Sequence, residues 1–372
     1  MISIFQINDN LARLYTIFPY LGQVQNKIGL ILSILSGSNY RIVLKNYIIS
    51  FKNHEFNLLL YFLGVISFAS SFQIKTDGVL KIIIDKNEFE FSLRNLTLEE
   101  KNLLELIFVA IKFGADLVTS NETKMLRKKS IRISNMHNKR VVETYDGLKF
   151  FLDSMNPGNT IGETFVSDVH YINSKINFKD KIVIDVGAEC GDTALYFAKK
   201  GAIVYAIEPM KASYEAMIRN LKLNSELSKR ITPINAAIGK DEMLKFYHDK
   251  NKEVGESASF VYNVHKNFTI SEVKGYTINT LLKEFNVKNV ELLKMDCKGC
   301  EFFLTNTDLT NVNVIKLEYN AKVTKQNLDK LLNVLEESGF VYTLYKHVVS
   351  DRSSLRQRGT ILGIKKMLVE QY

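Results

Sequence analysis

Short apolar runs recur at regular intervals along the second half of the chain, separated by stretches with helical spacing. The runs predict strands at residues 181–186, 203–207, 231–237, 292–296, 314–318, 340–346 and 360–364. The stretches between them predict helices at residues 193–199, 212–223, 280–285 and 325–338. Strands joined by crossover helices lie mostly parallel, so the pattern predicts an α/β fold with a doubly wound, mostly parallel, seven-stranded sheet. Such sheets bind ligands in a crevice at the carboxyl ends of their strands. Residues 243–276 are richer in β-type residues and predict an added hairpin over this crevice.

The first part of the chain lacks this regular alternation and predicts a smaller α+β domain. Residues 81–84 and 89–93 flank a polar turn, as in a β-hairpin, and Thr97 starts a capping box before an amphipathic helix. A second β-rich stretch covers residues 131–152. These segments match no catalytic motif, so the sequence leaves the role of this domain open.

The turn-forming residues 156–159 (Asn-Pro-Gly-Asn) are the clearest break in the chain. They predict an N-terminal domain over residues 1–155 and a ligand-binding domain over residues 156–372. The longest apolar stretch, residues 58–72, contains one glycine and three serines. It is shorter than the roughly 20 residues that a membrane span needs. We therefore expect a buried helix there and no membrane span.

Residues 181–208 carry the most specific signal in the sequence. An apolar run ends at Asp185, a turn containing Gly187 and Gly191 follows, and a second apolar run ends at Glu208. This is the strand–turn–helix–strand unit that binds nucleoside cofactors. We expect the two glycines to let the backbone approach a ligand. Glu208, about 20 residues past the turn, is placed to accept both hydroxyls of a ribose.

The spacing of the turn separates two classes of cofactor. A dinucleotide site needs Gly-x-Gly-x-x-Gly and a pyrophosphate at the helix start, and Asp192 would repel that group. S-adenosylmethionine carries an ammonium, a sulfonium and a ribose but no phosphate, so the acids Asp185, Asp192 and Glu208 suit it. A nicotinamide-dependent oxidoreductase is the disfavoured alternative, and a cofactor-binding module without catalysis is another.

Four blocks, in order, resemble the FkbM-type methyltransferases, which are class I S-adenosylmethionine-dependent enzymes. Residues 183–193 and 206–209 look like the first two family motifs, residues 235–239 resemble the strand end beside adenine, and residues 292–301 are similar to Leu-Leu-Lys-Ile-Asp-Val-Glu-Gly-Ala-Glu. The resemblance implies a Rossmann-like class I fold over about residues 160 to 366, with S-adenosylmethionine as cofactor. It implies cofactor contacts from Asp185, Gly187, Ala188, Glu189, Gly191, Asp192, Thr193, Glu208, Pro209, Asn235, Ala236 and Asp296.

Three departures from the family pattern stand out. Glu189 replaces an asparagine, Cys297 and Cys300 replace a valine and an alanine, and Lys298 replaces a glutamate on the acceptor side. The cysteine pair suggests a zinc or redox site, and a cluster with Cys190 is an alternative because the strands before these loops are usually neighbours. Structural zinc needs four ligands, so we predict no metal.

Carboxylates at strand ends are the candidates for catalysis. Methyl transfer is an in-line displacement that chiefly needs alignment, and a hydroxyl acceptor gains from a nearby base. We expect Asp296 to orient or deprotonate the acceptor, with Glu301 and Glu318 as further candidates. Glu301 is alternatively a first-turn helix acid, and Glu318 a surface partner of Lys316 or Lys294. The predicted reaction is O-methylation of a sugar, a glycan or another small metabolite.

The formal charge of +9 is spread over both parts of the chain and permits an anionic partner without requiring one. The densest basic segment, residues 124–140, predicts an RNA methyltransferase as the alternative function, although no aromatic residue interleaves it. Its basic residues are Lys124, Arg127, Lys128, Lys129, Arg132, Lys139 and Arg140. Three cysteines make no disulfide framework and the N-terminus has no secretion signal, so we expect a cytoplasmic protein.

Overall fold

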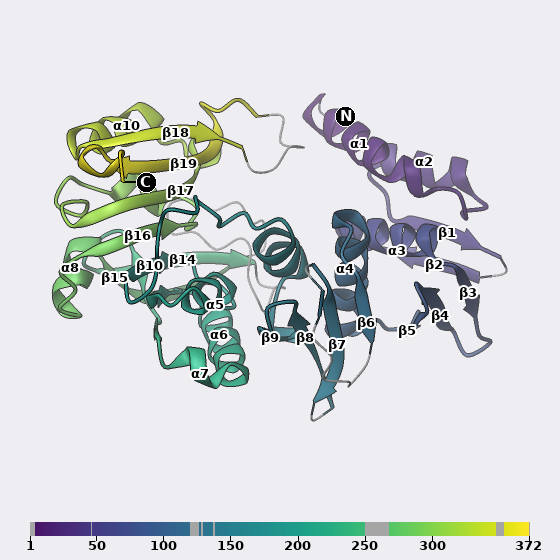
Figure 1. Cartoon of the computed structure of the whole chain (residues 1–372). Helices are drawn as coiled ribbons and strands as arrows, with labels where there is room; N and C mark the ends of the chain where they lie inside the picture. Colours follow the sequence, from purple (N-terminus) through teal and green to yellow (C-terminus); the bar gives the residue numbers. More distant parts are fainter. Residues whose placement is uncertain are drawn as a thin grey trace. The chain divides into compact units, whose positions relative to one another are not determined.

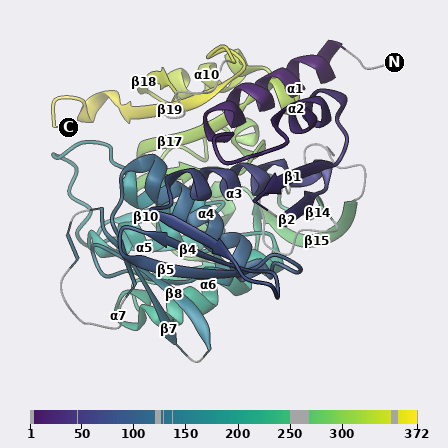
Figure 2. The same cartoon turned by 90° about the vertical axis from the view of Figure 1, so that its right-hand side faces the viewer.

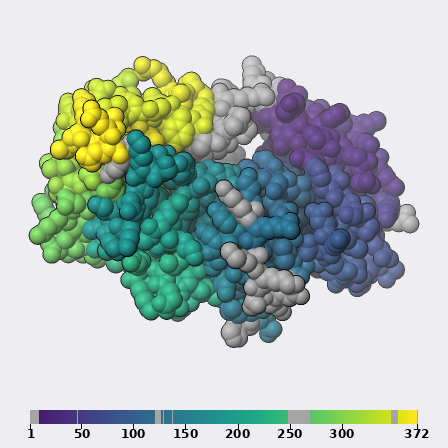
Figure 3. All heavy atoms as spheres, in the orientation of Figure 1, coloured from purple at the N-terminus to yellow at the C-terminus, as the bar shows by residue number. Residues whose placement is uncertain are grey.

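The computed structural model describes residues 4–45, 47–119, 126–127, 129–136, 138–249, 268–346 and 353–371. The chain divides into two compact units, Met1–Ser167 and Asp168–Tyr372. The first unit is coloured from purple to blue and the second from teal to yellow (Figures 1 and 3). Each unit has its own sheets and helices.

The second unit is built on one seven-stranded sheet with the strand order β12-β11-β10-β16-β17-β19-β18 (Figure 1). Neighbouring strands from β12 to β17 pair in parallel, and β19 runs antiparallel to both β17 and β18. The predicted doubly wound, mostly parallel, Rossmann-like fold is confirmed. The strands are β10 Ile182–Val186, β11 Ile203–Ile207, β12 Ile231–Ile234, β16 Val290–Met295, β17 Val312–Asn320, β18 Phe340–Tyr345 and β19 Arg358–Lys365.

The strand order reverses at β10, which is followed outward by β11 and β12 before the chain returns to β16 on its other side. Such a reversal opens a crevice at the carboxyl ends of the strands. The last long helix starts later than predicted, because Lys325 has a left-handed φ of 55° and the side chain of Asn327 caps the helix start. The connecting helices are α5 Asp192–Lys199, α6 Lys211–Leu223, α7 Ser225–Ser228, α8 Ile278–Glu284, α9 Ala321–Thr324 and α10 Leu328–Glu337.

One apolar core holds the central strands in place. Ile184 of β10 and Leu293 of β16 are fully buried in it, together with Leu281 of α8 and Leu335 of α10. Burying one such side chain stabilises a fold by about 1.5–3 kcal/mol. The core therefore fixes the positions of the strand ends, where the polar residues lie.

A second, smaller sheet in this unit has the order β13-β15-β14. The predicted strand at residues 231–237 is split, because the chain leaves the large sheet after β12 and β13 Ala237–Ile238 pairs with β15 Phe268–Tyr276. β14 Met243–Asp249 runs antiparallel to β15, as expected for an added hairpin. Residues 250–267 of the predicted hairpin lie outside the described part of the chain.

The first unit is an α+β arrangement with three small sheets. In Figure 2, β4 and β5 lie side by side, in agreement with their antiparallel pairing. The sheets have the orders β1-β2, β3-β4-β5 and β6-β7-β8-β9. The elements are α1 Ile4–Ile17, α2 Lys27–Ser36, β1 Tyr40–Leu44, β2 Tyr47–Phe51, α3 Phe56–Phe68, β3 Ser71–Ile74, β4 Val79–Ile84, β5 Asn87–Ser92, α4 Leu98–Phe113, β6 Leu117–Thr119, β7 Ile131–Met136, β8 Lys139–Thr144 and β9 Lys149–Phe151.

Local sequence signals of this unit take the expected form. The Thr97 hydroxyl accepts a hydrogen bond from the Glu100 N–H at 3.2 Å, and the Glu100 carboxylate accepts one from the Thr97 N–H at 2.8 Å. The apolar stretch at residues 58–72 forms most of α3, and its last two residues belong to β3. Within the described ranges, none of the helices combines the length and the apolar character that crossing a bilayer would require.

The compact units divide later than the turn at residues 156–159 predicts. A π-helix at Gly158–Val166 follows that turn and packs against α4 in the first unit. The packing is close, because a Cβ on Gly162 would lie 2.9 Å from Cγ1 of Val109. The turn marks where the chain bends, and the helix behind it belongs to the first unit.

Candidate cofactor pocket

A cavity of about 610 Å³ lies at the carboxyl ends of β10, β11 and β16. This is the crevice that the strand order predicts. Its wall comes from the turn after β10, the chain after β11, the start of β13, one residue of β14 and the loop after β16. The lining residues are Val186, Gly187, Glu189, Ile207, Glu208, Pro209, Met210, Ala236, Ala237, Ile238, Phe246, Asp296, Cys297, Lys298 and Cys300.

The two glycines of the turn fit against the protein itself. Gly187 has a φ of 76°, and a Cβ there would lie 2.2 Å from the carbonyl oxygen of Asp296. Gly191 has a φ of 85°, and its Cβ would lie 2.8 Å from Cγ of Met217. Side chains are disfavoured at both positions by the backbone angle as well as by space. The sequence predicts that these glycines admit a ligand, whereas the structure shows that they admit neighbouring parts of the chain.

Glu208 follows β11, and backbone N–H groups hold its carboxylate in the cavity wall. Its Oε2 accepts a hydrogen bond from the Glu189 N–H at 2.9 Å, and its Oε1 accepts one from the Met210 N–H at 2.8 Å. Burial raises the pKa of Glu208 to about 7, although these two N–H groups act to lower it. Each oxygen keeps a further lone pair, so the carboxylate can also accept hydrogen bonds from two hydroxyl groups.

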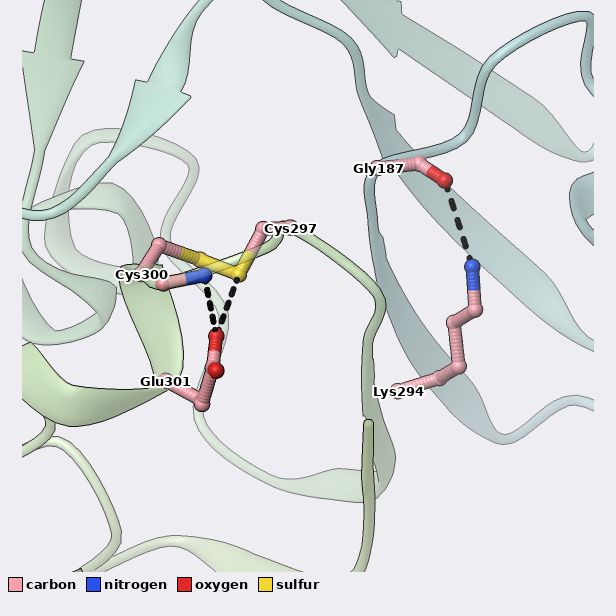
Figure 4. The surroundings of a disulfide bond; sticks show 6 residues. Gly187, Lys294, Cys297, Cys300 and Glu301 are labelled. Atoms are coloured by element: carbon pink, nitrogen blue, oxygen red, sulfur yellow. Dashed lines mark hydrogen bonds between the residues drawn. A yellow bond between two sulfur atoms is a disulfide. The ribbon is translucent and has the colours of Figure 1, made fainter. Parts of the chain in front are cut away.

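Asp185 lies beneath the cavity and is not among its lining residues. It is completely buried and forms an ion pair with Lys294 of β16 at 2.9 Å. The Lys294 ammonium also donates a hydrogen bond to the Gly187 carbonyl at 3.2 Å (Figure 4). Burial alone would lower the pKa of Lys294, but the Asp185 and Asp296 carboxylates raise it above its ordinary value. The charged lysine therefore ties β10 to β16 under the turn.

Three further predicted cofactor residues support the turn from behind. Ala188 is buried, and the side chain of Asp192, at the start of α5, accepts a hydrogen bond from the Cys190 thiol at 3.8 Å. The hydroxyl of Thr193 lies 3.2 Å from Nε2 of His170. None of these three predicted residues lines the cavity.

Asn235 holds the chain after β11 by donating hydrogen bonds to the carbonyls of Glu208 at 2.8 Å and Pro209 at 3.1 Å. The predicted cofactor residues that line the cavity are Gly187, Glu189, Glu208, Pro209, Ala236 and Asp296. Those outside its wall are Asp185, Ala188, Gly191, Asp192, Thr193 and Asn235. Sequence reasoning missed the apolar wall of Met210, Ile238 and Phe246, and the only signal for it was the β-rich hairpin expected over the crevice.

Asp296 comes directly after β16, and its side chain meets that of Glu318 from β17. These strands pair in parallel with Met295 opposite Leu317, so Asp296 lies beside Glu318, which is two residues before the end of β17. Burial, and then the hydrogen-bonded Glu318 carboxyl, raise the pKa of Asp296 to about 6, against the lowering effect of Lys298 and Lys294. Two carboxyl groups so close together favour a shared proton. The structure thus brings two predicted catalytic residues together, and Asp296 is the one that lines the cavity.

The sequence offers a surface ion pair with Lys294 or Lys316 as the alternative role of Glu318. Both lysines are buried instead. Lys294 pairs with Asp185, and the Lys316 ammonium donates a hydrogen bond to the carbonyl of Val169. Burial, together with the Lys294 charge, lowers the pKa of Lys316 to about 8. Glu318 therefore does not belong to a solvated surface pair.

Glu301, the third predicted catalytic acid, lies behind the loop that follows β16 and is completely buried. Burial raises the pKa of Glu301 to about 8. Cys297 and Cys300 form a disulfide next to it (Figure 4). Cys190 is buried and is not part of this disulfide. Among the described residues, the group with metal-ligand spacing is Cys297, Cys300 and Glu301, with atoms within 4.8 Å of one another. A three-cysteine cluster with Cys190 is therefore not formed.

Residues 185–342 match the methyltransferase FkbM domain. The second unit therefore contains an FkbM methyltransferase domain. The match confirms the resemblance seen in the sequence, and with it S-adenosylmethionine as cofactor and methyl transfer as the reaction class. The alternative prediction of a nicotinamide-dependent oxidoreductase is wrong, because the matched domain is a methyltransferase domain.

Solved structures similar to the chain include other methyltransferases, and no curated protein matches it. Fibrillarin, a pre-rRNA processing protein of Methanococcus jannaschii, is 12% identical with a TM-score of 0.36, covering 80% of this chain and 97% of its own. A precorrin-6y C5,15-methyltransferase of Geobacter metallireducens is 12% identical with a TM-score of 0.29, covering 52% and 84%. A tRNA m1G37 methyltransferase of M. jannaschii is 15% identical with a TM-score of 0.33, covering 68% and 73%. The FkbM assignment rests on the family match and the strand order.

Proposed function

We propose that the protein transfers a methyl group from S-adenosylmethionine to a hydroxyl oxygen of a small-molecule or glycan acceptor. The observation that carries this proposal is the carboxyl pair of Asp296 and Glu318 at the cofactor cavity. A hydroxyl is a weak nucleophile until a base orients it or accepts its proton, and a base with a pKa near the working pH is the most effective. The chain contains no Asn-Pro-Pro-Tyr or Asp-Pro-Pro-Tyr block, which disfavours amino-group methylation of bases.

The lining of the cavity suits the parts of S-adenosylmethionine. Glu208 offers two carboxylate oxygens to the ribose hydroxyls, and the apolar side chains of Ile238 and Phe246 offer a surface for the adenine ring. The acid Glu189, which lines the cavity, is complementary to the ammonium group. When bound, the cofactor supplies a methyl carbon activated by a positive sulfur.

In this proposal Asp296 accepts the proton of the acceptor hydroxyl, or holds that hydroxyl in line with the methyl carbon. Glu318 raises the basicity of Asp296, because its charge disfavours the ionised form of Asp296 and its carboxylate accepts a hydrogen bond from the protonated form. Lys298, on the loop that lines the cavity, keeps Asp296 ionised near neutral pH by lowering its pKa. After the transfer, the proton remains on the carboxyl pair until solvent takes it.

The basic segment at residues 124–140 gives little support to an RNA acceptor. Three of its cations already form ion pairs with carboxylates, which removes charge that phosphates would need. Lys124 and Lys128 lie outside the described residues. The pairs are Arg132 with Glu143 at 2.8 Å, Lys139 with Asp153 at 2.7 Å and Arg140 with Glu99 at 2.9 Å.

The acceptor class is tested by incubating the full chain with cell extract and methyl-labelled S-adenosylmethionine. We expect the label as a methyl ether in a small-molecule or glycan fraction. Label that sediments with RNA, or that is recovered as a methylated amine, would contradict the proposal. A thermal-shift control checks the cofactor, because S-adenosylhomocysteine should stabilise the folded protein whereas NADH should not.

A further inference from the structure

The loop after β16 places a disulfide in the wall of the cofactor cavity. Cys297 and Cys300 are three residues apart, and both line the cavity. Cys297 is partly exposed and Cys300 is buried. Lys298 and Gly299 between them have φ values of 52° and 132°, a region that L side chains rarely adopt. The disulfide thus closes a tight loop next to Asp296, the proposed base.

Glu301 meets this disulfide from the protein interior. Its Oε2 accepts a hydrogen bond from the Gly299 N–H at 2.8 Å and lies 3.5 Å from Sγ of Cys297 (Figure 4). Its Oε1 is buried without a hydrogen-bond partner among the described residues. Because burial raises the pKa of Glu301 to about 8, the carboxyl carries a proton at neutral pH. Glu301 is not among the residues that line the cavity, and the proposed methyl transfer assigns no role to this proton.

We propose that Cys297, Cys300 and Glu301 form a redox-active dithiol–disulfide site, which exchanges electrons with dithiol reductants and whose oxidation state sets the affinity for the cofactor. The pair stands in a loop that lines the cofactor cavity and directly follows Asp296, the proposed base. The ordinary reason for a buried disulfide is stability, but this one closes only a four-residue loop. The chain-entropy gain from so short a loop is small.

The exchange follows from which sulfur is exposed. A thiolate of the dithiol reductant attacks the accessible Sγ of Cys297, forms a mixed disulfide and releases Cys300 as a thiolate. The second thiol of the reductant then attacks its partner's sulfur and releases Cys297. Glu301, 3.5 Å away, gives its proton to Cys297, and solvent supplies the proton for Cys300 and reprotonates Glu301. The protein gains two electrons and two protons, and the reductant leaves as a disulfide.

The oxidation state reaches the cofactor through the backbone of the same loop. The Asp296 N–H donates a hydrogen bond to the Val186 carbonyl at 2.9 Å, directly beside the Gly187 turn. The disulfide holds Lys298 and Gly299 in their left-handed conformations, and reduction frees them to relax. A wall that must be ordered again on binding lowers affinity, so we expect the oxidised protein to bind S-adenosylhomocysteine about tenfold more tightly than the reduced protein.

The primary test measures thiols and affinity on the full chain in the same buffers. Protein equilibrated with oxidised or reduced dithiothreitol is denatured and alkylated, and the number of labels is counted by mass spectrometry. S-adenosylhomocysteine binding in each buffer is measured by calorimetry. We expect one alkylated cysteine after oxidation and three after reduction, since Cys190 is not part of the disulfide. Three labels in every buffer, or dissociation constants within twofold of each other, would overturn the proposal and leave the methyltransferase function standing.

Variants separate the roles of the three residues. Cys297→Ser and Cys300→Ser should each bind S-adenosylhomocysteine with the weaker affinity of the reduced protein, whatever the buffer. Glu301→Gln should still form the disulfide but be reduced about tenfold more slowly, because its amide cannot release a proton. Equal reduction rates would remove Glu301 from the site. Zinc bound one-to-one by the reduced wild type, with no disulfide formed on oxidation, would make the group a metal site and overturn the redox assignment.

Discussion

The two sides of the cofactor cavity hold their carboxylates in opposite ways. On the β10–β11 side, Glu208 accepts two backbone N–H groups and Asp185 pairs with Lys294. On the β16–β17 side, Asp296 meets a second carboxyl, that of Glu318. Burial raises the pKa of both Glu208 and Asp296. The two N–H groups act to lower the pKa of Glu208, whereas the Glu318 carboxyl raises the pKa of Asp296 further. The roles that we propose, cofactor binding for Glu208 and proton acceptance for Asp296, therefore follow from the neighbours of each acid and not from its place at a strand end.

The sharpest test of this comparison removes the proton acceptor and keeps its shape. Asp296→Asn should bind S-adenosylhomocysteine within about threefold of wild type, while the rate at saturating cofactor and acceptor falls by about 10²–10⁴, as for a lost general base. The exposed acid Glu215 on α6 provides the matched control, Glu215→Gln, which should leave the rate unchanged. A saturated rate within threefold of wild type for Asp296→Asn would move Asp296 to the binding side.

The second test removes the positive charge that compensates the buried Asp185 carboxylate on the β10–β11 side of the cavity. Lys294→Met leaves the buried Asp185 without its counter-charge, so the free energy of unfolding should fall by about 3–5 kcal/mol. Urea unfolding measures this loss, and Lys211→Met at an exposed ion pair should lose less than about 1 kcal/mol. Equal losses in the two variants would mean that the Asp185–Lys294 pair does not hold β10 and β16 together.

The third test concerns binding without catalysis. Glu208→Ala should weaken S-adenosylhomocysteine binding by about 1.5–3 kcal/mol, the range for hydrogen bonds to a charged group. The rate should recover once cofactor is raised to saturation, because Glu208 takes no part in proton transfer. Calorimetry gives the first quantity and initial rates give the second. An unchanged dissociation constant would place Glu208 outside the site.

The smallest expected effect is a shift in pH dependence. The base must be ionised, so the saturated rate should fall as pH drops below about 6, the pKa of Asp296. Glu318→Gln removes the neighbouring charge that raises this pKa, so the acidic limb should move to lower pH. Rate profiles of both proteins measure the shift. A limb that moves to higher pH, or does not move, would show that Glu318 does not set the basicity of Asp296.

Features that depend on neighbours along the chain were predictable from the sequence. Apolar runs end at Asp296 and Glu318, so the pattern identifies both acids as candidates at one edge of the sheet. The register of β16 against β17 is what places them side by side. The Asp185–Lys294 pair was not predictable, because it depends on the register in which β10 meets β16. Phe246 reaches the cavity from a hairpin whose placement no local pattern specifies.

The loop with Cys297 and Cys300 also combines a feature that the sequence predicts with features that only the fold shows. The spacing of Cys297 and Cys300 suggests a zinc or redox site, but only the fold shows that Cys190 stays apart and that Glu301 lies against the pair. The turn at residues 156–159 was likewise predictable only in part, because turn-forming residues show where a chain bends. They do not show that the following helix packs back on α4.

Gly187 carries a consequence for how such an enzyme can change. With 2.2 Å between its missing Cβ and the Asp296 carbonyl oxygen, any side chain would push the turn after β10 away from the loop that carries Asp296, the proposed base. An in-line displacement tolerates little added distance between the reacting atoms. New acceptors can therefore be accommodated by exchanging residues around the rim of the cavity, whereas Gly187 cannot be replaced by any other residue without moving the backbone.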